Sequence, residues 1–497
     1  MGRNICLYSR RGECVSESVF RTYQIWIKPG HRLFSYAEQM CQDAKNLYNI
    51  TNFYIRQVYT ALRQDKPVEP LQQEVMDTLQ TNIGPMNESQ LQAHQSRLQK
   101  QLQKPPHQRK GSRCNLFGMP TRESPYIDFL FLNCLFKVID QADYRALPTQ
   151  SSQWVMKLVF STWQSFYSSL KDYRAHPNKY TGRPRIPGYT RTKIREVILT
   201  NQDCEIKNHK YLKLPKTKHR LNIGKLGYTD GQLKQVRIVP RYSKYVIELV
   251  FACSTEEADV KKENMLAIDL GINRLATIVT NTGHKPVCVK GKPLKAINQY
   301  YNKLKAHYTG ILRKGKQPKE GSHTSKRLEQ LHLKRHQRIK DMFHKTSYNI
   351  VKLAKEEQIG IIVIGYNQGW KNQSELGRRN NQSFCHIPHQ MLVSMIRYKA
   401  EALGIEVILT EEAYTSQASF LDRDPLPKYE EVGIRSFSGK RVHRGLYQSR
   451  TSLIHADVNG AANILRKVFP KACSDGIAGL DGTQSVNVST PLMLSIS

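Results

Sequence analysis

Four acidic residues lie where predicted strands end or a predicted helix begins, and together they suggest metal-dependent phosphodiester chemistry. They are Asp269, Glu411, Glu412 and Asp457. A centre with two divalent ions about 3.5 to 4 Å apart needs several carboxylates, because the ions repel each other and phosphate oxygens alone do not neutralise them. Mg²⁺ prefers oxygen ligands and keeps part of its water shell, so three acids on separate elements would suffice.

Asp269 lies at the rim of a predicted β-hairpin in MLAIDLGINRLATIVT, residues 265–280. The run Leu266 to Ile268 is apolar, a Leu-Gly-Ile-Asn turn follows the acid, and a second apolar run extends from Leu275 to Val279. Continuous apolar runs suit strands covered on both faces. Such a strand needs no acid, so Asp269 is either an ordinary turn residue or a metal ligand.

The other acids also have ordinary explanations. Asp457 precedes a predicted helix in HADVNGAANILRKVF, where Asp often caps the helix N-terminus. Glu411 and Glu412 directly follow the predicted strand Ile405 to Leu409, and charged residues at the end of a strand are common. Only the rest of the chain can decide between these explanations and a shared site.

The composition predicts a polyanionic partner. The chain has 497 residues, long enough for several domains, and 76 Lys and Arg against 41 acids give a formal charge of +35. The excess runs through most of the chain, so we expect salt-sensitive contact of several domains with a long phosphate backbone.

The sequence indicates an intracellular, prokaryotic-type protein in the cytoplasm. No run approaches the roughly 18 uncharged apolar residues of a membrane span, and the first residues lack the apolar core of a signal peptide. The ten cysteines include no C-x-x-C pair, so we expect reduced, mostly structural thiols.

Upstream of the hairpin, the pattern predicts a β-domain interrupted by a helical one. A strand is predicted at TYQIWIK, residues 22–28, and helices follow. The helices are expected over Ser35–Arg63, 126–145 and 150–174, with weakly packed helices and loops in 65–124 and an aromatic core stripe in the last helix. Further strands are expected at Val197–Thr200, Tyr211–Leu214, Gln235–Val239 and Tyr245–Ala252.

A basic loop, NKYTGRPRIPGYTRTK, occupies residues 178–193. It is either a site that follows a phosphate backbone or a plain surface loop. Its candidate contacts are Arg183, Arg185, Tyr189 and Arg191.

Downstream of the hairpin, a long basic helical region is expected at 296–345, broken at 314–322. Strand and helix then alternate as in an α/β sheet. The predicted elements are helix Met342–Glu357, strand Gly360–Ile364, helix Pro388–Leu403 and strand Ile405–Leu409.

The order of these elements resembles a known family. AIDLGINRLAT, IIVIGYNQGWK, GIEVILTEEAYTSQASFLDRD and ADVNGAANILRKVFP are similar to successive motifs of the RuvC-like nuclease domain of TnpB proteins. These are transposon-encoded, RNA-guided DNA endonucleases related to compact type V CRISPR effectors. The resemblance covers about 263–470 and is weaker over the N-terminal half.

The resemblance implies an Asp-Glu-Asp triad that binds Mg²⁺, with the first Asp at Asp269 and the last at Asp457. Where most relatives end the second motif's strand on Glu, this chain has Gly365. The site is therefore either inactive or completed by Glu411 or Glu412 from the adjoining strand end. We favour displacement. Adjacent residues of a strand point to opposite faces, so one of the two glutamates is expected to face the metal.

Two further features depart from the family or extend it. Many relatives carry two C-x-x-C pairs before the last Asp, but residues 418–455 contain no cysteine, so we predict no zinc site there. Arg441 and Arg444 of this insert remain candidates for nucleic-acid contact. Trp370 and Lys371, after the second motif's strand, are candidates for contact with the DNA strand, although Trp is more often buried.

The implied architecture is a multidomain α+β and α/β protein with a β-barrel-like wedge domain, an inserted helical recognition domain and a RuvC-like nuclease domain of RNase H fold. The expected segments are 1–34, a leader and first wedge strand; 35–175, the recognition domain; 176–262, the second part of the wedge; 263–416 and 456–470, the nuclease domain; 417–455, the nucleic-acid-binding insert; and 471–497, a disordered tail.

The implied function is RNA-guided DNA cleavage. A guide RNA would recognise double-stranded target DNA beside a short adjacent motif, and one RuvC-like site in a monomeric protein would hydrolyse the DNA with two Mg²⁺ ions. Three alternatives stay open. They are a catalytically inactive RNA-guided binder, a DNA transposase, and a structural RNA-binding protein, the last of which leaves the acids at three element ends unexplained.

Overall fold

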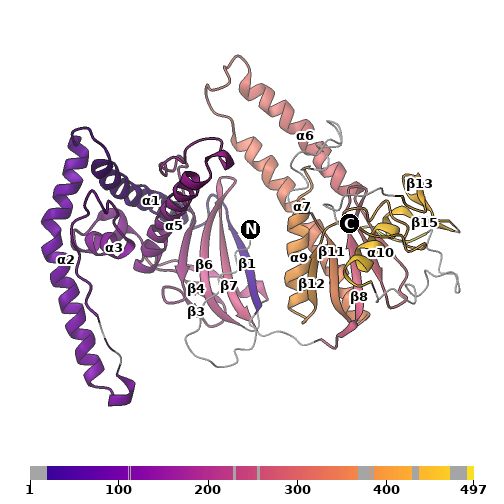
Figure 1. The fold of residues 1–497 in the computed structure, drawn as a ribbon, viewed down its shortest axis with the longest axis horizontal. Helices are drawn as coiled ribbons and strands as arrows, with labels where there is room; N and C mark the ends of the chain where they lie inside the picture. Colours follow the sequence, from indigo (N-terminus) through magenta and orange to yellow (C-terminus); the bar gives the residue numbers. More distant parts are fainter. Residues whose placement is uncertain are drawn as a thin grey trace. The chain divides into compact units, whose positions relative to one another are not determined.

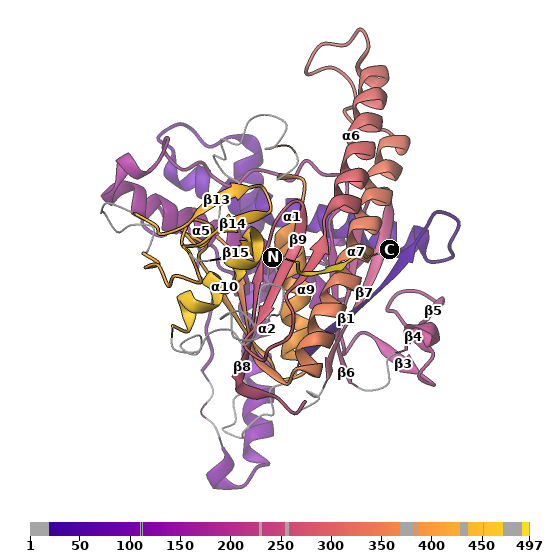
Figure 2. The ribbon, with the colours of Figure 1, turned by 90° about the vertical axis from the view of Figure 1, so that its right-hand side faces the viewer.

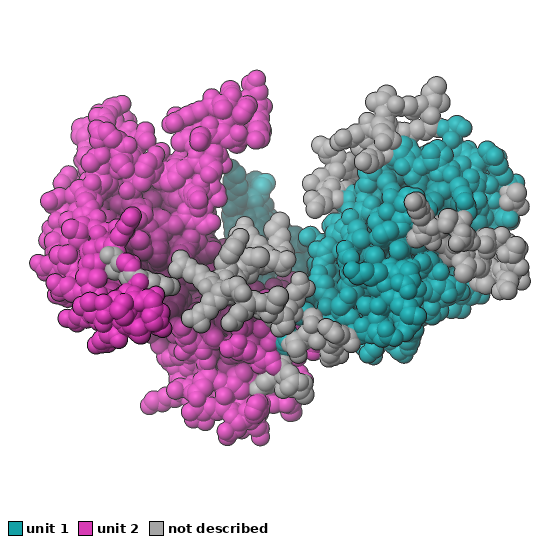
Figure 3. Space-filling model, turned by 60° about the horizontal axis from the view of Figure 1, so that its bottom comes forward, with its two compact units in different colours: residues 1–19, 253–497 teal, residues 20–252 magenta. Residues whose placement is uncertain are grey.

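The structure is a computed structural model that describes residues 19–109, 111, 113–227, 231–253, 258–367, 382, 385–427, 436–450, 452–470 and 490–496. The chain divides into two compact units (Figure 3): residues 20–252, drawn in magenta and called the first unit here because they come first in the chain, and residues 1–19 with 253–497, drawn in teal and called the second unit. Both units mix helices and strands, so the protein is a multidomain α/β protein.

The first unit is built on a four-stranded sheet in the order β1-β7-β6-β2 (Figure 1). The strands are β1 (Val19–Ile27), β2 (Val197–Thr200), β6 (Gln232–Arg241) and β7 (Lys244–Cys253). Helices α1 (Phe34–Arg63) and α5 (Thr149–Ala175) pack on each other and on β2. The predicted strand–helices–strands order is therefore confirmed.

The barrel-like closure predicted for this unit does not form among the strands that the structure describes. The four-stranded sheet is open, with β1 and β2 at its edges, and a separate three-stranded sheet follows it. The separate sheet consists of β3 (Glu205–Lys207), β4 (Tyr211–Lys213) and β5 (Arg220–Asn222). Because helices cover β2 and β6, the sheet buries an apolar face without closing on itself.

The remaining helices of this unit differ in how deeply they are buried. They are α2 (Pro70–Leu102), α3 (Phe129–Val138) and α4 (Ala142–Ala146). On α5, Trp163 and Phe166 are buried, as the aromatic stripe predicted. The long α2 begins with a reciprocal capping box between Glu69 and Gln72 and buries few residues, in agreement with the weak packing predicted for residues 65–124.

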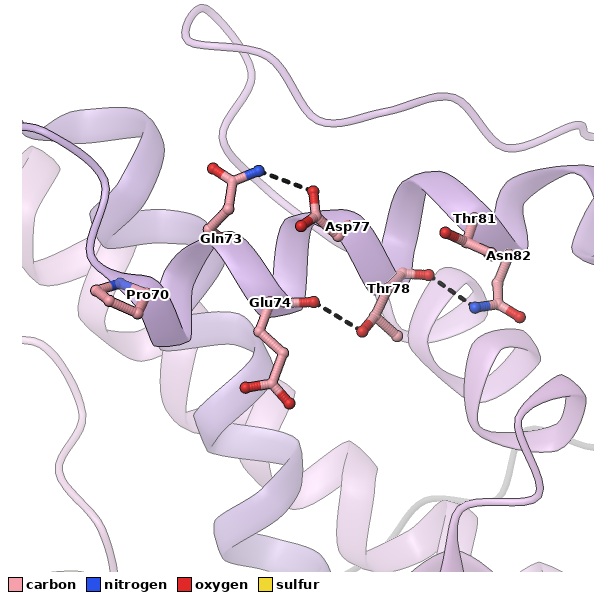
Figure 4. Close-up of a pocket in the computed structure, with 7 residues that line it drawn as sticks. All are labelled: Pro70, Gln73, Glu74, Asp77, Thr78, Thr81 and Asn82. Atoms are coloured by element: carbon pink, nitrogen blue, oxygen red, sulfur yellow. Dashed lines mark hydrogen bonds between the residues drawn. The ribbon is translucent and has the colours of Figure 1, made fainter.

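A shallow hollow on α2 carries no cluster suited to catalysis. Its polar residues hydrogen-bond along the helix itself: Gln73 donates to Asp77, and Thr78 to the carbonyl of Glu74, both at 2.8 Å (Figure 4). The hollow is lined by Pro70, Gln73, Glu74, Asp77, Thr78, Thr81 and Asn82.

The second unit is built on a six-stranded sheet in the order β12-β11-β8-β9-β10-β16. The predicted hairpin is confirmed, because β8 and β9 pair antiparallel, and β11 runs parallel to both β8 and β12. The strands are β8 (Lys261–Asp269), β9 (Arg274–Thr280), β10 (Val287–Lys290), β11 (Ile359–Gly365), β12 (Glu406–Thr410) and β16 (Leu492–Leu494).

Helices cover both faces of this sheet. Helices α7 (Lys326–Glu356) and α9 (His389–Glu401) pack on one face, where Leu266 and Ile268 point. Helix α10 (Ala456–Val468) packs on the other, with Ala267 and Val363. Since side chains alternate along a strand, positions 269 and 365 belong to the face covered by α10.

Helix α6 (Lys292–Arg313) and the first part of α7 extend together beyond the sheet (Figure 2). The break between them agrees with the predicted one, and α7 joins the end of the basic region and the predicted helix at 342–357 into one helix. Within the described residues, no helix is long and apolar enough to cross a membrane.

The prediction of a disordered tail is wrong for residues 490–496. Strand β16 pairs in parallel with β10 and Ile496 is buried. The short apolar run at 492–494 lies in a chain segment otherwise rich in Ser, Gly and Thr. Strand β10 gives it an open edge with unpaired backbone groups, which favours pairing. Residues 471–489 lie outside the described residues.

Candidate active site

The carboxyl ends of three parallel strands lie side by side in the second unit. Ile364 of β11 pairs with Ile268 of β8, and Gly365 pairs with Thr410 of β12. Parallel strands that end at one edge bring the residues after them together, and ligands commonly bind outside such an edge. Helix α10 packs across β8, β9 and β11 near this edge.

Asp269, the last residue of β8, faces α10. A Cβ atom on Gly460 of α10 would lie 2.8 Å from Oδ2 of Asp269, so glycine allows the helix to approach the carboxylate. Burial, followed by the nearby carboxylate of Asp457, raises the pKa of Asp269, and the guanidinium of Arg441 opposes this shift. The carboxyl group of Asp269 is therefore costly to ionise without a cation beside it.

Glu412 occupies the space above Gly365. A Cβ atom at position 365 would lie 2.6 Å from Oε1 and 2.8 Å from Cγ of Glu412, and 2.5 Å from Cδ1 of Ile464. Oε1 of Glu412 is buried and has no hydrogen-bond partner in the described part of the chain. Burial, and then the charge of Asp269, raises the pKa of the Glu412 carboxyl group.

Glu411 points to a different partner. Its Oε1 lies 2.8 Å from Nζ of Lys467 on α10, and this lysine is nearly buried, with 9% of its side chain exposed. The two neighbouring glutamates thus separate, Glu412 towards Asp269 and Glu411 towards a lysine.

Asp457 lies in the first turn of α10 and is not its N-cap residue, so the capping explanation is wrong. His455 is the N-cap, and its Nδ1 accepts a hydrogen bond from the Asp457 N–H at 3.3 Å. Oδ1 of Asp457 lies 3.1 Å from Nη2 of Arg441. Arg441 belongs to β13 (Lys440–His443), which forms a three-stranded sheet with β14 (Leu446–Gln448) and β15 (Leu453–His455).

These residues form an acidic pair with a third acid nearby. Within the described residues, no three His, Cys, Asp or Glu side chains converge as a ready metal cluster. The donors nevertheless suit a hard divalent cation, which takes carboxylate oxygens. A cation beside Asp269 and Glu412 would relieve both raised pKa values and would give the unpartnered Oε1 a ligand bond.

The basic loop of the first unit is fixed on α1. Buried Asn52 donates to the carbonyls of Pro187 and Gly188 at 3.3 and 3.1 Å, and accepts a hydrogen bond from Nε1 of Trp163 at 2.8 Å. Arg56 donates to the Pro187 carbonyl at 2.6 Å. Hydrogen bonds from α1 side chains therefore hold the backbone of the loop in place.

All the predicted nucleic-acid contacts that the structure describes are exposed. Arg183, Arg185 and Arg191 are exposed, and Tyr189 is exposed with the guanidinium of Arg56 over its ring at 5.2 Å. In the second unit both Arg441 and Arg444 are exposed, and Arg441 is also paired with Asp457. Trp370 and Lys371 lie outside the described residues.

Sequence reasoning missed Lys467 and Asn367. Oδ1 of Asn367 accepts the N–H of Glu412 at 3.0 Å. The signal for Lys467 was helical spacing, because residues 457, 460, 464 and 467 fall on one face of a helix. Asn367 follows β11 in an irregular segment, and no periodic signal identifies it.

Comparisons with known proteins agree with this order of elements. Residues 248–371 match the family model OrfB of IS605, described as a probable transposase, and residues 389–464 match the TNB domain of Cas12f1-like proteins. These two matches confirm the resemblance to the TnpB family over the regions they cover. This is a family of RuvC-like nucleases, and its two matched regions contain all four acids considered above. No curated protein sequence matches the chain.

Some solved structures also resemble the chain distantly. A Cas12f1–sgRNA–target DNA complex has 12% identity and a TM-score of 0.44, covering 90% of this chain and 98% of that chain. The mini-RNA-guided endonuclease CRISPR-Cas_phi3 has 10% identity and a TM-score of 0.34, covering 72% and 86%. We draw no conclusion from likeness at this level.

Proposed function

We propose that this TnpB-family protein is an RNA-guided DNA endonuclease with a RuvC-like domain of RNase H fold in residues 263–416 and 456–470. It uses a guide RNA to recognise double-stranded DNA beside a short adjacent motif and hydrolyses phosphodiester bonds at one site. The observation that carries the proposal is the Glu412 carboxylate, which fills the space over Gly365 and lies beside Asp269. It supports displacement of the middle acid in preference to its loss.

Asp269, Glu412 and Asp457 are the proposed Mg²⁺ ligands. When bound, Mg²⁺ supplies an acidified water and neutralises charge on the phosphate. The chain's own residues set the conditions for binding. Gly460 admits α10 beside Asp269, and burial raises the pKa of both carboxyl groups, which a bound cation would lower again. We assign no ligand role to Glu411, because its Oε1 pairs with Lys467 whereas Oε1 of Glu412 lies over Gly365 beside Asp269.

The basic loop is the proposed contact with a nucleic-acid backbone. Arg183, Arg185 and Arg191 are exposed on a segment that α1 holds in place. Rigid presentation lowers the entropy lost on binding. Backbone contacts of this kind position a nucleic acid without reading its sequence, which agrees with base pairing by a guide RNA as the source of specificity.

The insert is proposed to act without zinc. Asp424 is buried and accepts hydrogen bonds from the N–H groups of Ser419 and Ser438 at 2.8 and 3.0 Å. Asp422 accepts the Ser438 hydroxyl at 2.8 Å. These carboxylates tie the start of the insert to Ser438 in its middle, a cross-link of the kind that a zinc site would otherwise supply.

The test is cleavage of a matched target plasmid by protein purified with its native RNA. Wild type should cut in Mg²⁺ and not in EDTA. Asp269→Ala and Glu412→Ala should each lose more than the roughly 10- to 100-fold typical of residues outside the metal's ligand shell, while Glu411→Ala retains more activity. Cutting that survives Glu412→Ala but not Glu411→Ala would refute the assignment.

The second candidate is a catalytically inactive RNA-guided DNA-binding protein. The ion pair of Asp457 with Arg441 favours it, because it neutralises the third acid. In that case no variant cuts, and the RNA-bound wild type still holds its matched target. A transposase, the activity in the family's description, would instead join DNA ends and would need no bound RNA of defined sequence.

A further inference from the structure

The residues on both sides of Glu412 are tied to one lysine. Nζ of Lys467 lies 2.8 Å from Oε1 of Glu411 and donates to the carbonyl of Ala413 at 3.1 Å. The lysine is nearly buried, whereas 38% of the Glu411 side chain is exposed. A single buried ammonium group, with three donors, therefore holds the chain just before and just after the acid.

Side chains also hold the backbone of Glu412 itself. Its N–H donates to Oδ1 of Asn367 at 3.0 Å, and its carbonyl accepts the hydroxyl of Thr415 at 2.9 Å. Thr415 is in turn fixed by Nδ2 of Asn463 on α10, which donates to its carbonyl at 2.9 Å. Both backbone polar groups of Glu412 are thus satisfied, and its half-buried side chain, with a buried Oε1, is left facing Asp269.

An acid at this position needs such support. Strand β12 ends at Thr410, so Glu412 lies beyond the hydrogen-bond ladder that fixes a residue inside a strand. Position 365, by contrast, is the last residue of β11. An acid that leaves the strand end for the loop loses the strand's support, and other contacts must replace it before the carboxylate has one place in the site.

Helix α10 provides the replacement. Asp457, Gly460 and Lys467 lie on one face of this helix by their spacing. The same rigid element thus carries one proposed ligand, adjoins Asp269 through Gly460, and anchors the loop that carries Glu412.

We propose that Lys467 is a positioning residue for the displaced acid, which it holds through Glu411 and the Ala413 carbonyl so that Glu412 faces the metal site. This inference rests on the proposed function. It gives Glu411 a defined role as the anchor of Lys467, and it assigns Lys467 no contact with substrate or metal.

The test measures occupancy of the metal site without measuring DNA cleavage. Fe²⁺ placed at a Mg²⁺ site cuts the polypeptide nearby in the presence of ascorbate and peroxide, so the full-length, RNA-bound protein reports its own metal affinity through fragments ending near residues 269 and 412. Lys467→Met should raise the Fe²⁺ concentration for half-maximal cutting about 10- to 100-fold, as expected for an outer-shell residue. Lys467→Arg, which keeps the charge, should recover part of this loss.

Lys399→Met is the matched control. Nζ of Lys399 donates to the His344 carbonyl and the Ser347 hydroxyl, both at 2.7 Å, between α7 and α9 on the opposite face of the sheet. Like Lys467→Met, the Lys399→Met variant removes a largely buried lysine ammonium group from the second unit. It should lower Tm and leave the Fe²⁺ dependence unchanged.

The outcomes separate the two hypotheses. If Glu412→Ala loses the fragments while Lys467→Met and Glu411→Gln keep the wild-type Fe²⁺ dependence, the positioning role is overturned and the metal site stands. If wild type and Glu412→Ala give the same fragments, or neither gives any, the proposed function fails and the inference fails with it. If Lys467→Met does not fold, Lys467→Arg and Glu411→Gln decide by the same measurement.

Discussion

Asp269 and Glu412 reach the same point of the second unit by different means. Asp269 is the last residue of β8 and pairs with Thr277 of β9, so the sheet's own hydrogen bonds set its place. Glu412 lies beyond β12 and is held by side chains from Asn367, Thr415 and Lys467. A position set by backbone pairing follows from the fold alone, whereas a position set by side chains depends on several residues at once and is the easier of the two to change.

The strongest test of this difference between the two acids is to move the second acid from the loop to the end of strand β11. Gly365→Glu alone should destabilise the protein, because the new side chain meets Glu412 and Ile464. Glu412→Gly alone should abolish cleavage. The double variant should regain at least about tenfold over Glu412→Gly, since contacting residues are not additive. Plasmid cleavage and Tm measure both effects.

Gly365→Glu with Glu411→Gly is the control for this exchange, because it leaves Glu412 in the way. It should stay inactive and unstable. If the Gly365→Glu/Glu412→Gly double variant is as inactive as Glu412→Gly, a carboxylate at position 365 does not reach the metal site.

The two acids should respond to pH together despite their different supports. Their pKa values are raised to about 7 for Asp269 and about 8 for Glu412. The folded state therefore binds protons that the unfolded chain, with ordinary values near 4 (roughly 3.9 to 4.3), has released. Without metal, the stability contributed by these groups is greatest below about pH 4 and is lost progressively as the pH rises from there to about 7 to 8.

Mg²⁺ should offset that loss, because it binds the ionised carboxylates. The rise in Tm caused by Mg²⁺ should be small at pH 6 and larger at pH 8.5, as measured by thermal unfolding in Mg²⁺ and in EDTA. Asp269→Asn should flatten the dependence. An Mg²⁺ effect that is independent of pH would contradict the placement of the two acids as a buried pair.

The basic loop at 178–193 resembles the loop that carries Glu412, because side chains, here those of α1, also hold it in place. Arg185→Ala should lower the slope of log binding constant against log salt concentration by about 0.9 for duplex DNA or about 0.7 for a single strand. Binding of the protein to RNA and to target DNA at several salt concentrations measures this slope for each. Arg145→Ala is the matched change, since Arg145 is already paired with Asp140 at 2.7 Å. Equal slopes for both variants would exclude the loop as a contact with the nucleic-acid backbone.

Removal of residues 490–497 tests a contact made mainly by backbone pairing. Strand β16 is separated from β8 by β10 and β9, and it buries Ile496. Its loss should cost about 1 to 3 kcal/mol, the burial of one or two apolar side chains, with cleavage per folded molecule unchanged. Thermal unfolding and plasmid cleavage test this. A loss of cleavage without loss of stability would mean that the tail serves the site itself.

The sequence predicted the parts of the site that strand patterns control. The apolar runs around Asp269 located the hairpin, and the alternation of strands and helices after it predicted that the ends of β11 and β12 would lie beside Asp269. Choosing between Glu411 and Glu412 required the loop after β12, where period-2 alternation no longer applies. The choice depended on Lys467, more than fifty residues further along the chain.

Other errors have the same physical origin. The open first sheet was expected to close like a barrel, because alternation shows which face of a strand is buried but not whether the sheet's edges meet. The strand at 492–494 was missed because three apolar residues in a polar tail give no periodic signal. Its structure depends on the open edge of β10, which is a feature of the folded sheet.

Gly365 also constrains the mutational paths open to this chain. With Glu412 above it, any side chain at 365 would begin within 2.6 Å of a carboxylate oxygen, so an acid cannot return to the strand end by a single substitution. A carboxylate at the strand end becomes accessible only if position 412 changes and the side chain of Ile464 shifts as well. Steric exclusion therefore keeps the acid on the loop, even without an advantage in activity.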